Sequence, residues 1–381
     1  MRSEFRNQVA VIGIGCTRFG ELYETSAEQL ICEAAFEAMA DAKVEPAQIE
    51  AAWVGTVMSQ LAGDALGDPL KLHGIPITRV SMYCASGMDA FRNASLAIAS
   101  GVYDLALVLG FEKMRDGGIH RPNRIHPVID NGERAPHIFA LAANRYFKQY
   151  GATKATLAKV AVKNHKHGTL SPKAHLRMEI TEEAVLKAPL IYSPLGLFDC
   201  CPTTDGAAAA VLCRADRARE FRDDPIFVKG VGLAVVSGQP YYKPSFDYLG
   251  FPATQKAVAT AYAQAGVGAG DIDFAEVHDC FTITEILNYE DLGFCPRGAG
   301  GRFVEEGRSA LGGDTPINPS GGLKSFGHPV GATGVRMLTE LTTQLRHQAG
   351  PRQVPNARLG LAHNLGGPGA VACVSILGNE A

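Results

Sequence analysis

Apolar positions along this chain alternate between the spacing of strands and the spacing of helices. Residues 9–15 form a short apolar run typical of a buried strand, and Ser26 is the expected N-cap of the amphipathic helix that follows. Val80 and Met82 alternate on a further strand that ends at a turn of small residues, and residues 87–101 have the apolar spacing of a helix. Strands that alternate with helices predict βαβ units and a mostly parallel sheet.

The same order of elements returns in the second part of the chain. Residues 38–56 align with residues 261–279 without a gap, and a helix is expected to begin after a turn at Ser86-Gly87 and again at Thr333-Gly334. We therefore predict two similar halves of one architecture. The aligned segments are identical at Ala38, Ala40, Ala42, Val44, Ile49, Ala52 and Val54 and at their counterparts.

Composition changes between about residues 112 and 222, and we interpret this segment as an insertion that covers one face of the paired halves. It carries a run of basic residues. Two interpretations stay open: a seat for an anionic, phosphate-bearing substrate, or a solvated helix face. The run contains Lys154, Lys159, Lys163, His165, Lys166, His167, Lys173, His175 and Arg177.

Composition and charge exclude several classes of protein. With 381 residues, 46% hydrophobic content and a net charge of −3, the chain can bury sizeable cores but lacks the basic field of a nucleic-acid-binding protein. No apolar run approaches the roughly 18 residues of a spanning helix. The nine cysteines are scattered and include no C-x-x-C pair, so we expect neither disulfides nor a metal site, and a cytoplasmic location.

Cys84 lies where the strand that contains Val80 gives way to a helix. Unpaired backbone N–H groups and the positive end of a helix dipole at such a junction favour the thiolate over the thiol. The position therefore predicts a nucleophile. The alternative is a small buried side chain, which is how most free cysteines behave.

Three segments of the second half carry further candidate groups. His278 and Cys280 alternate after a predicted strand, so their side chains can point in the same direction. His278 could then act as a polarising group and Cys280 as a proton-transfer thiol; core packing is the alternative. His328 lies in a loop rich in glycine and proline, before a helix. The glycines of residues 363–369 either present N–H groups to a developing oxyanion or form a plain tight turn.

Four strings, in this order and spacing, resemble the thiolase superfamily, and within it the sterol-carrier-protein-type and archaeal-type thiolases. They are C-A-S-G from Cys84, H-D-C-F from His278, G-H-P-V-G-A-T-G around His328 and H-N-L-G-G-P-G from His363. The resemblance implies an α/β thiolase fold with two similar βαβ halves in a layered αβαβα arrangement. Residues 1–224, with a loop-domain insertion at about 112–222, would form the first half, and residues 225–381 the second.

The resemblance also implies a role for each matching residue. Cys84 corresponds to the nucleophile that takes the acyl group, His328 to the histidine that activates it, and His278 to a histidine of the oxyanion hole. Cys280 corresponds to the thiol that exchanges a proton with the α-carbon. A backbone oxyanion site would lie near Gly366, together with the N–H of Cys84.

One departure from the family pattern concerns the second catalytic cysteine of conventional thiolases. That cysteine belongs to a C-x-G motif near the C-terminus, where this chain has His363-Asn364. Cys280 must therefore supply the second thiol if a Claisen step takes place.

The implied activity is acyl transfer through an acyl-cysteine, with Claisen condensation or thiolytic cleavage of acyl-CoA. A coenzyme A thioester would be the substrate, with no permanently bound cofactor, and the assembly a homodimer or a dimer of dimers. Some relatives instead work with a zinc-ribbon/OB-fold companion and pass the acyl group to a partner enzyme or a non-CoA acceptor. Retro-aldol relatives lack the nucleophile, and a non-catalytic lipid-binding or scaffold subunit is a further alternative. His137 is a candidate for the acyl pocket.

Overall fold

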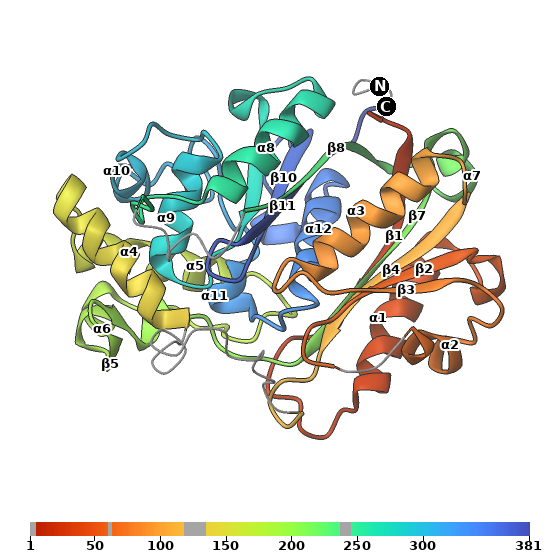
Figure 1. Ribbon diagram of the computed structural model, residues 1–381, viewed down its shortest axis with the longest axis horizontal. Coiled ribbons are helices and arrows are strands. Elements are labelled where there is room, and N and C mark those ends of the chain that lie inside the picture. Colours follow the sequence, from red (N-terminus) through yellow and green to blue (C-terminus); the bar gives the residue numbers. More distant parts are fainter. Residues whose placement is uncertain (1–4, 60–62, 118–134, 237–244) are drawn as a thin grey trace.

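A computed structural model describes residues 5–59, 63–117, 135–236 and 245–381 (Figure 1). Within these residues, a nine-stranded sheet runs in the order β3-β2-β4-β7-β1-β8-β11-β10-β9, and a separate two-stranded sheet pairs β5 with β6. The strands are β1 Val9–Cys16, β2 Ala51–Gly55, β3 Ile77–Val80, β4 Leu105–Glu112, β5 Leu190–Tyr192, β6 Leu195–Gly196, β7 Gly206–Arg214, β8 Ile226–Val235, β9 Phe274–Val277, β10 Leu359–Gly366 and β11 Val371–Gly378.

The helices connect these strands or stand outside the large sheet. The first, α1, begins where predicted, because the Ser26 hydroxyl accepts a hydrogen bond from the N–H of Gln29 at 3.1 Å. The helices are α1 Ala27–Ala42, α2 Asp64–Leu70, α3 Ser86–Ala99, α4 Ala135–Tyr150, α5 Lys154–Thr169, α6 Glu182–Lys187, α7 Ala218–Phe221, α8 Pro252–Ala265, α9 Thr282–Asp291, α10 Gly300–Glu305, α11 Gly322–Phe326 and α12 Thr333–Leu345. In the part of the chain that is described, none of the helices has the length and apolar character needed to cross a bilayer.

The predicted internal repeat is present in the sheet. The strand order β2-β4-β7-β1 in the first half matches β9-β10-β11-β8 in the second, and the halves meet where Ala10 and Val11 of β1 pair with β8. The aligned segments also correspond element by element. In the first half α1 is followed by a 3-10 turn at Pro46–Gln48 and by β2, and in the second α8 is followed by a turn at Ala269–Asp271 and by β9.

Helices and sheet form the layers expected of the αβαβα arrangement. The helices α3 and α12 pack against each other and against strands of both halves, so they form the inner layer (orange and blue in Figure 1). The helix α1 covers the outer face of β1 and β7, and α8 covers the outer face of β8 and β11. Both faces of each half of the sheet are therefore covered by helices.

The sheet is mixed, so the expectation of a mostly parallel sheet was wrong. Only the pairs β2 with β3, β2 with β4 and β9 with β10 are parallel. The pairs of β7 with β4 and β1, and of β11 with β10 and β8, are antiparallel. The reason is that the last strand of each half returns without a crossover helix laid on the sheet, as in the short connection between β10 and β11.

The segment outside the sheet is shorter than the predicted insertion of residues 112–222. The strand β7 falls within that range, yet it is a buried strand between β4 and β1. The stretch that carries α4, α5, α6 and the β5-β6 pair stands outside the large sheet. Several side chains of its basic run form ion pairs with other residues of this chain. Lys163 of α5 is buried and donates to Glu285 at 2.6 Å, and Lys173 lies 2.5 Å from Glu37. The predicted boundary at residue 224 stays a prediction.

The starts of α3 and α12 approach each other so closely that only glycine fits between them. A Cβ on Gly87 would lie 2.4 Å from the carbonyl oxygen of Gly331, and a Cβ on Gly334 would lie 2.4 Å from the backbone nitrogen of Met88. Both atoms belong to backbone, so neither can move aside cheaply. This contact between backbones fixes the distance between the starts of α3 and α12, and thus between the two halves.

We expect Gly87→Ala to lower the free energy of unfolding by about 1–3 kcal/mol, because the added methyl group forces α3 and α12 apart. Urea unfolding followed by circular dichroism measures the change. Gly270→Ala is the matched control, since a Cβ there meets nothing within 4 Å, and it should change stability by less than about 0.5 kcal/mol. Equal midpoints for the two variants would contradict the close approach.

Candidate active site

The turn that carries Cys84 is locked by a hydrogen-bonded serine. Between the end of β3 and the start of α3, the hydroxyl of Ser86 accepts from the N–H of Met82 at 2.8 Å and donates to the carbonyl oxygen of Tyr83 at 2.6 Å. Tyr83 has a positive φ of 51°, an uncommon conformation for a residue with a side chain. Cys84 thus lies at the strand-to-helix junction, as predicted, in a turn of defined shape.

His278 and Cys280 follow β9 and precede α9, and both are buried. Between them, Asp279 points the other way and accepts hydrogen bonds from the N–H groups of Leu323 and Lys324 at 2.6 and 3.1 Å. The segment after β9 therefore holds the start of α11. Because α11 leads directly to His328, Asp279 helps to place that histidine.

His328 lies between α11 and α12 and is also buried. Its Nδ1 atom is 2.7 Å from the hydroxyl oxygen of Thr333, which also donates to the carbonyl oxygen of Pro329 at 3.0 Å. The nitrogen Nδ1 is thus occupied by the first residue of α12, which leaves Nε2 for another partner.

Three of the predicted residues meet at one place. Ligand-type atoms of Cys84, His278 and His328 all lie within 4.8 Å of one another, and the two imidazole rings have centroids 5.2 Å apart at an interplanar angle of 84°. Such a cluster could hold a metal ion, and it could equally serve in catalysis by a thiol and an imidazole. The expectation that no metal is bound here stays a prediction.

Both imidazoles of the site are held neutral. Burial, with a smaller contribution from the positive charge of Arg336, lowers the pKa of His328 to about 3. Burial also lowers the pKa of His278 well below its ordinary value, and the neighbouring His328 adds to this effect. At neutral pH each ring therefore has one protonated and one unprotonated nitrogen, as a proton acceptor or a hydrogen-bond donor requires.

The protonation state of Cys84 differs from the expectation of an ionised thiolate. Burial raises the pKa of the Cys84 thiol to about 12, and the backbone N–H groups of Gly367 and Cys84 offset this only in part. The residue as a whole is half-buried. Cys84 lies before the first residue of α3, Ser86, and among the described residues no cation lowers the pKa of its thiol. The resting pair is thus a thiol and a neutral imidazole.

The second thiol, Cys280, is likewise held in the protonated form. Burial raises its pKa well above the ordinary value, and the neighbouring sulfurs of Cys201 and Cys84 act in the same direction. Cys201 is a third thiol near the site that the sequence patterns did not single out, and its N–H donates to the carbonyl oxygen of Cys280 at 2.9 Å. Two adjacent cysteines, Cys200-Cys201, match no motif spacing that would have identified Cys201 as a site residue.

The glycine turn after β10 lies against the Cys84 turn. A Cβ on Gly366 would stand 2.6 Å from the carbonyl oxygen of Met82, so this residue provides close contact between the two turns. The N–H directed to the Cys84 sulfur is that of Gly367, one residue beyond the predicted Gly366. The oxyanion role predicted for Gly366 stays a prediction.

His137 packs its ring against Tyr192 of β5, with centroids 3.6 Å apart, and its place in an acyl pocket stays a prediction. Two residues further along α4, the ring of Phe139 stacks on Phe281 at 4.6 Å, next to Cys280 in the chain. The helix α4 therefore borders the site through an aromatic residue that we did not predict. Its apolar spacing is that of any core helix, so the sequence offers no signal for this contact.

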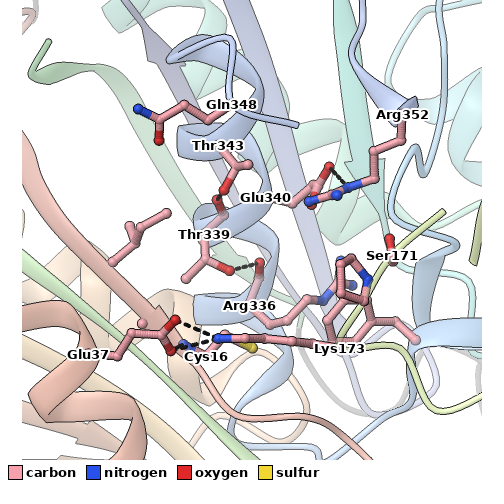
Figure 2. A pocket seen from close by; sticks show the side chains of 14 residues that line it. Cys16, Glu37, Ser171, Lys173, Arg336, Thr339, Glu340, Thr343, Gln348 and Arg352 are labelled. Atoms are coloured by element: carbon pink, nitrogen blue, oxygen red, sulfur yellow. Dashed lines mark hydrogen bonds and ion pairs between the residues drawn. The ribbon is translucent and has the colours of Figure 1, made fainter. Parts of the chain in front are cut away.

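A cavity of about 270 Å³ lies elsewhere, between the end of β1, α1 and α12 (Figure 2). Its described lining includes Cys16, Glu37 and Arg352 but none of the three clustered residues. Arg336 lines this cavity, while its Nη1 atom donates to Glu276 at 2.5 Å and to Ser320 at 2.7 Å. The cavity and the thiol-imidazole cluster are therefore different places in the molecule.

Comparison with known proteins shows the family to which the chain belongs. Residues 9–216 match the thiolase N-terminal domain, and residues 240–379 match the domain described as thiolase C-terminal domain-like. An acetyl-CoA acetyltransferase from Methanothermobacter thermautotrophicus is 42% identical over 379 residues, which cover 97% of this chain and 98% of that protein. Human sterol carrier protein 2 is 36% identical over 96% of this chain and 71% of its own length. The chain belongs to the thiolase family and is an acyltransferase.

Solved structures agree with the fold. One called Ltp2-ChsH2(DUF35) aldolase superposes with a TM-score of 0.89 at 27% identity and covers 98% of both chains. Human mitochondrial 3-ketoacyl-CoA thiolase superposes with a TM-score of 0.74 at 18% identity, over 99% of this chain and 100% of that one. The predicted thiolase fold is confirmed.

We expect the rate of alkylation of Cys84 by iodoacetamide to rise with pH, by about tenfold per unit, from about pH 6 to about pH 9. The reason is that a raised pKa leaves the thiolate scarce throughout this range and increasing with every unit. Peptide mass spectrometry after timed quenching measures the rate, and Cys84→Ser removes the signal. A rate that is already constant at neutral pH would show a preformed thiolate and contradict the neutral pair.

Proposed function

We propose that this chain takes an acyl group from an acyl-CoA thioester onto Cys84 and then catalyses Claisen condensation or its reverse, thiolytic cleavage. The observation that carries the proposal is the meeting of one thiol and two neutral imidazoles within 4.8 Å. The activity named for the relative at 42% identity, acetyl-CoA acetyltransferase, supports acetyl-CoA as the first substrate to test.

In the first half-reaction, the sulfur of Cys84 attacks the thioester carbonyl while its proton passes to Nε2 of His328. A neutral imidazole is the acceptor that this step needs, because the thiol is protonated at rest. The carbon–sulfur bond to coenzyme A then breaks, and the leaving thiolate takes the proton back from His328. The products are acyl-Cys84 and free coenzyme A.

In the second half-reaction, the Cys280 thiol first gives its proton to Nε2 of His328, and the resulting thiolate takes a proton from the α-carbon of another acyl-CoA. The carbanion attacks acyl-Cys84, and the Cys84 sulfur leaves as a thiol with the proton that His328 held. We assign the proton transfer to Cys280, whose thiol belongs to the same group of sulfurs as Cys84. In the direction of thiolysis Cys280 is the proton donor to the α-carbon as the carbon–carbon bond breaks. Its raised pKa keeps it protonated for that step. His278 and the N–H groups of the glycine turn stabilise the oxyanions.

A second candidate function is acyl transfer that depends on a zinc-ribbon/OB-fold companion. It is favoured by one observation, the likeness to a structure whose name joins Ltp2 with ChsH2(DUF35). The companion would supply either a route to a non-CoA acceptor or part of the substrate site. Coenzyme A thioesters remain the acyl source in both cases, with a homodimer as the proposed assembly and no resident cofactor.

Incubation with acetyl-CoA should add one acetyl group to the intact protein, and peptide mapping should place it on Cys84. The thiol is the nucleophile of the proposed first step, so Cys84→Ala should lose both the adduct and turnover. A wild-type chain that stays unmodified alone but is acetylated after addition of a companion would favour the second candidate. An adduct on any other residue would contradict both, and a scaffold would show no adduct at all.

Cys280→Ala should keep the acetyl adduct on Cys84 but lower the rates of condensation and thiolysis by about 10²–10⁴-fold, since only the second half-reaction needs its proton. Acetoacetyl-CoA consumption and mass spectrometry report the two steps separately. Cys213→Ala is the matched control, because Cys213 is a buried thiol of β7 outside the site. Full thiolysis by Cys280→Ala would show that another group moves the proton.

A further inference from the structure

The side chain of Asn364 makes a contact that the proposed mechanism does not yet use. Asn364 lies on β10, in the segment where conventional thiolases carry their C-x-G motif and this chain has His363-Asn364, and it is fully buried. Its amide nitrogen Nδ2 is 3.0 Å from Nδ1 of His278. The segment that replaces the C-x-G motif thus supplies an amide that contacts the histidine of the H-D-C-F string.

An amide nitrogen carries hydrogens and has no acceptor site, so it can only donate. Nδ1 of His278 must therefore be the unprotonated nitrogen of the ring. A neutral imidazole has one N–H, which leaves it on Nε2. Since Nδ1 is occupied by Asn364, Nε2 is the nitrogen left to face the cluster, and His278 presents a hydrogen-bond donor there.

The opposite arrangement holds at His328. The Thr333 hydroxyl has one hydrogen, which it donates to the carbonyl oxygen of Pro329 at 3.0 Å, so toward Nδ1 of His328 it acts as the acceptor at 2.7 Å. Nδ1 of His328 then carries the hydrogen, and Nε2 is unprotonated. The two imidazoles, with ring centroids 5.2 Å apart, thus show the cluster one acceptor and one donor.

We infer that Asn364 is a positioning residue that fixes His278 as the Nε2–H tautomer, so that His278 donates to the thioester oxyanion while His328 accepts the Cys84 proton. The inference rests on the proposed function for its chemical meaning.

The first test needs no turnover and no variant at position 364. In wild-type protein labelled with ¹⁵N-histidine, the nitrogen shifts of His278 should show a protonated Nε2 and an unprotonated Nδ1, and those of His328 should show the reverse. Loss of the corresponding signals in His278→Gln and His328→Gln assigns them. A protonated Nδ1 on His278 would overturn the inference whether or not the protein is an acyltransferase, so failure here is distinct from failure of the proposed function.

The second test replaces the donor by an acceptor. In Asn364→Asp the carboxylate takes a hydrogen from Nδ1, so Nε2 of the neutral ring loses its hydrogen and kcat for thiolysis should fall by about 10²-fold or more at neutral pH, with KM nearly unchanged. Activity should recover as the pH falls, because protonation of either the ring or the carboxyl group restores Nε2–H. Among the described residues, the titratable or charged groups that face His278 are Cys84, His328, His363 and Arg336, and all four are retained in Asn364→Asp.

Two further variants separate positioning from a merely structural role. Asn364→Ala should lose less activity than Asn364→Asp at neutral pH, since with no partner at Nδ1 the neutral ring can hold its hydrogen on either nitrogen. Ser375→Ala, a buried substitution on the neighbouring strand β11, should leave kcat and its pH profile unchanged. A loss in Asn364→Asp that is the same at every pH, in a variant whose melting temperature equals that of wild type, would overturn the inference.

Discussion

The close approach of α3 and α12 is the constraint on which the site depends. Gly87 and Gly334 allow the backbones at the two helix starts to touch, and the N–H of Gly331 is fixed by a hydrogen bond of 2.9 Å to Glu112 of β4. The turn before α3 carries Cys84 and the loop before α12 carries His328. A thiol from one half and an imidazole from the other therefore come into reach because no side chain separates their backbones.

Burial then determines the chemistry of the cluster. Both imidazoles and Cys280 are buried and Cys84 is half-buried, so the neutral forms of all four groups are favoured over the charged ones. In the proposed mechanism, proton transfer from Cys84 therefore accompanies the attack on the thioester and does not precede it. Such a site stores no ion pair at rest, and it can stabilise negative charge as it develops on the substrate.

The residues around the cluster act mainly through orientation. Asp279 holds the start of α11, Ser86 holds the turn before α3, and Thr333 and Asn364 each occupy one nitrogen of an imidazole. Each of these contacts joins elements that are distant in the sequence or that meet at a turn. The reacting groups are few, and most of the polar groups buried near them serve to hold those few in one geometry.

The sequence by itself predicted the thiolase fold through the resemblance that its short motifs carry. It also predicted the repeat and the candidates Cys84, His278, Cys280 and His328, because apolar spacing and short motifs are local properties of the chain. Only the tertiary structure decided which groups meet and how they are protonated. The raised pKa of Cys84, the antiparallel pairing of β7, the Gly367 N–H and the contact of Asn364 with His278 all depend on neighbours from other elements. Burial and hydrogen bonding between distant segments leave no periodic trace in a sequence, so these features required the folded chain.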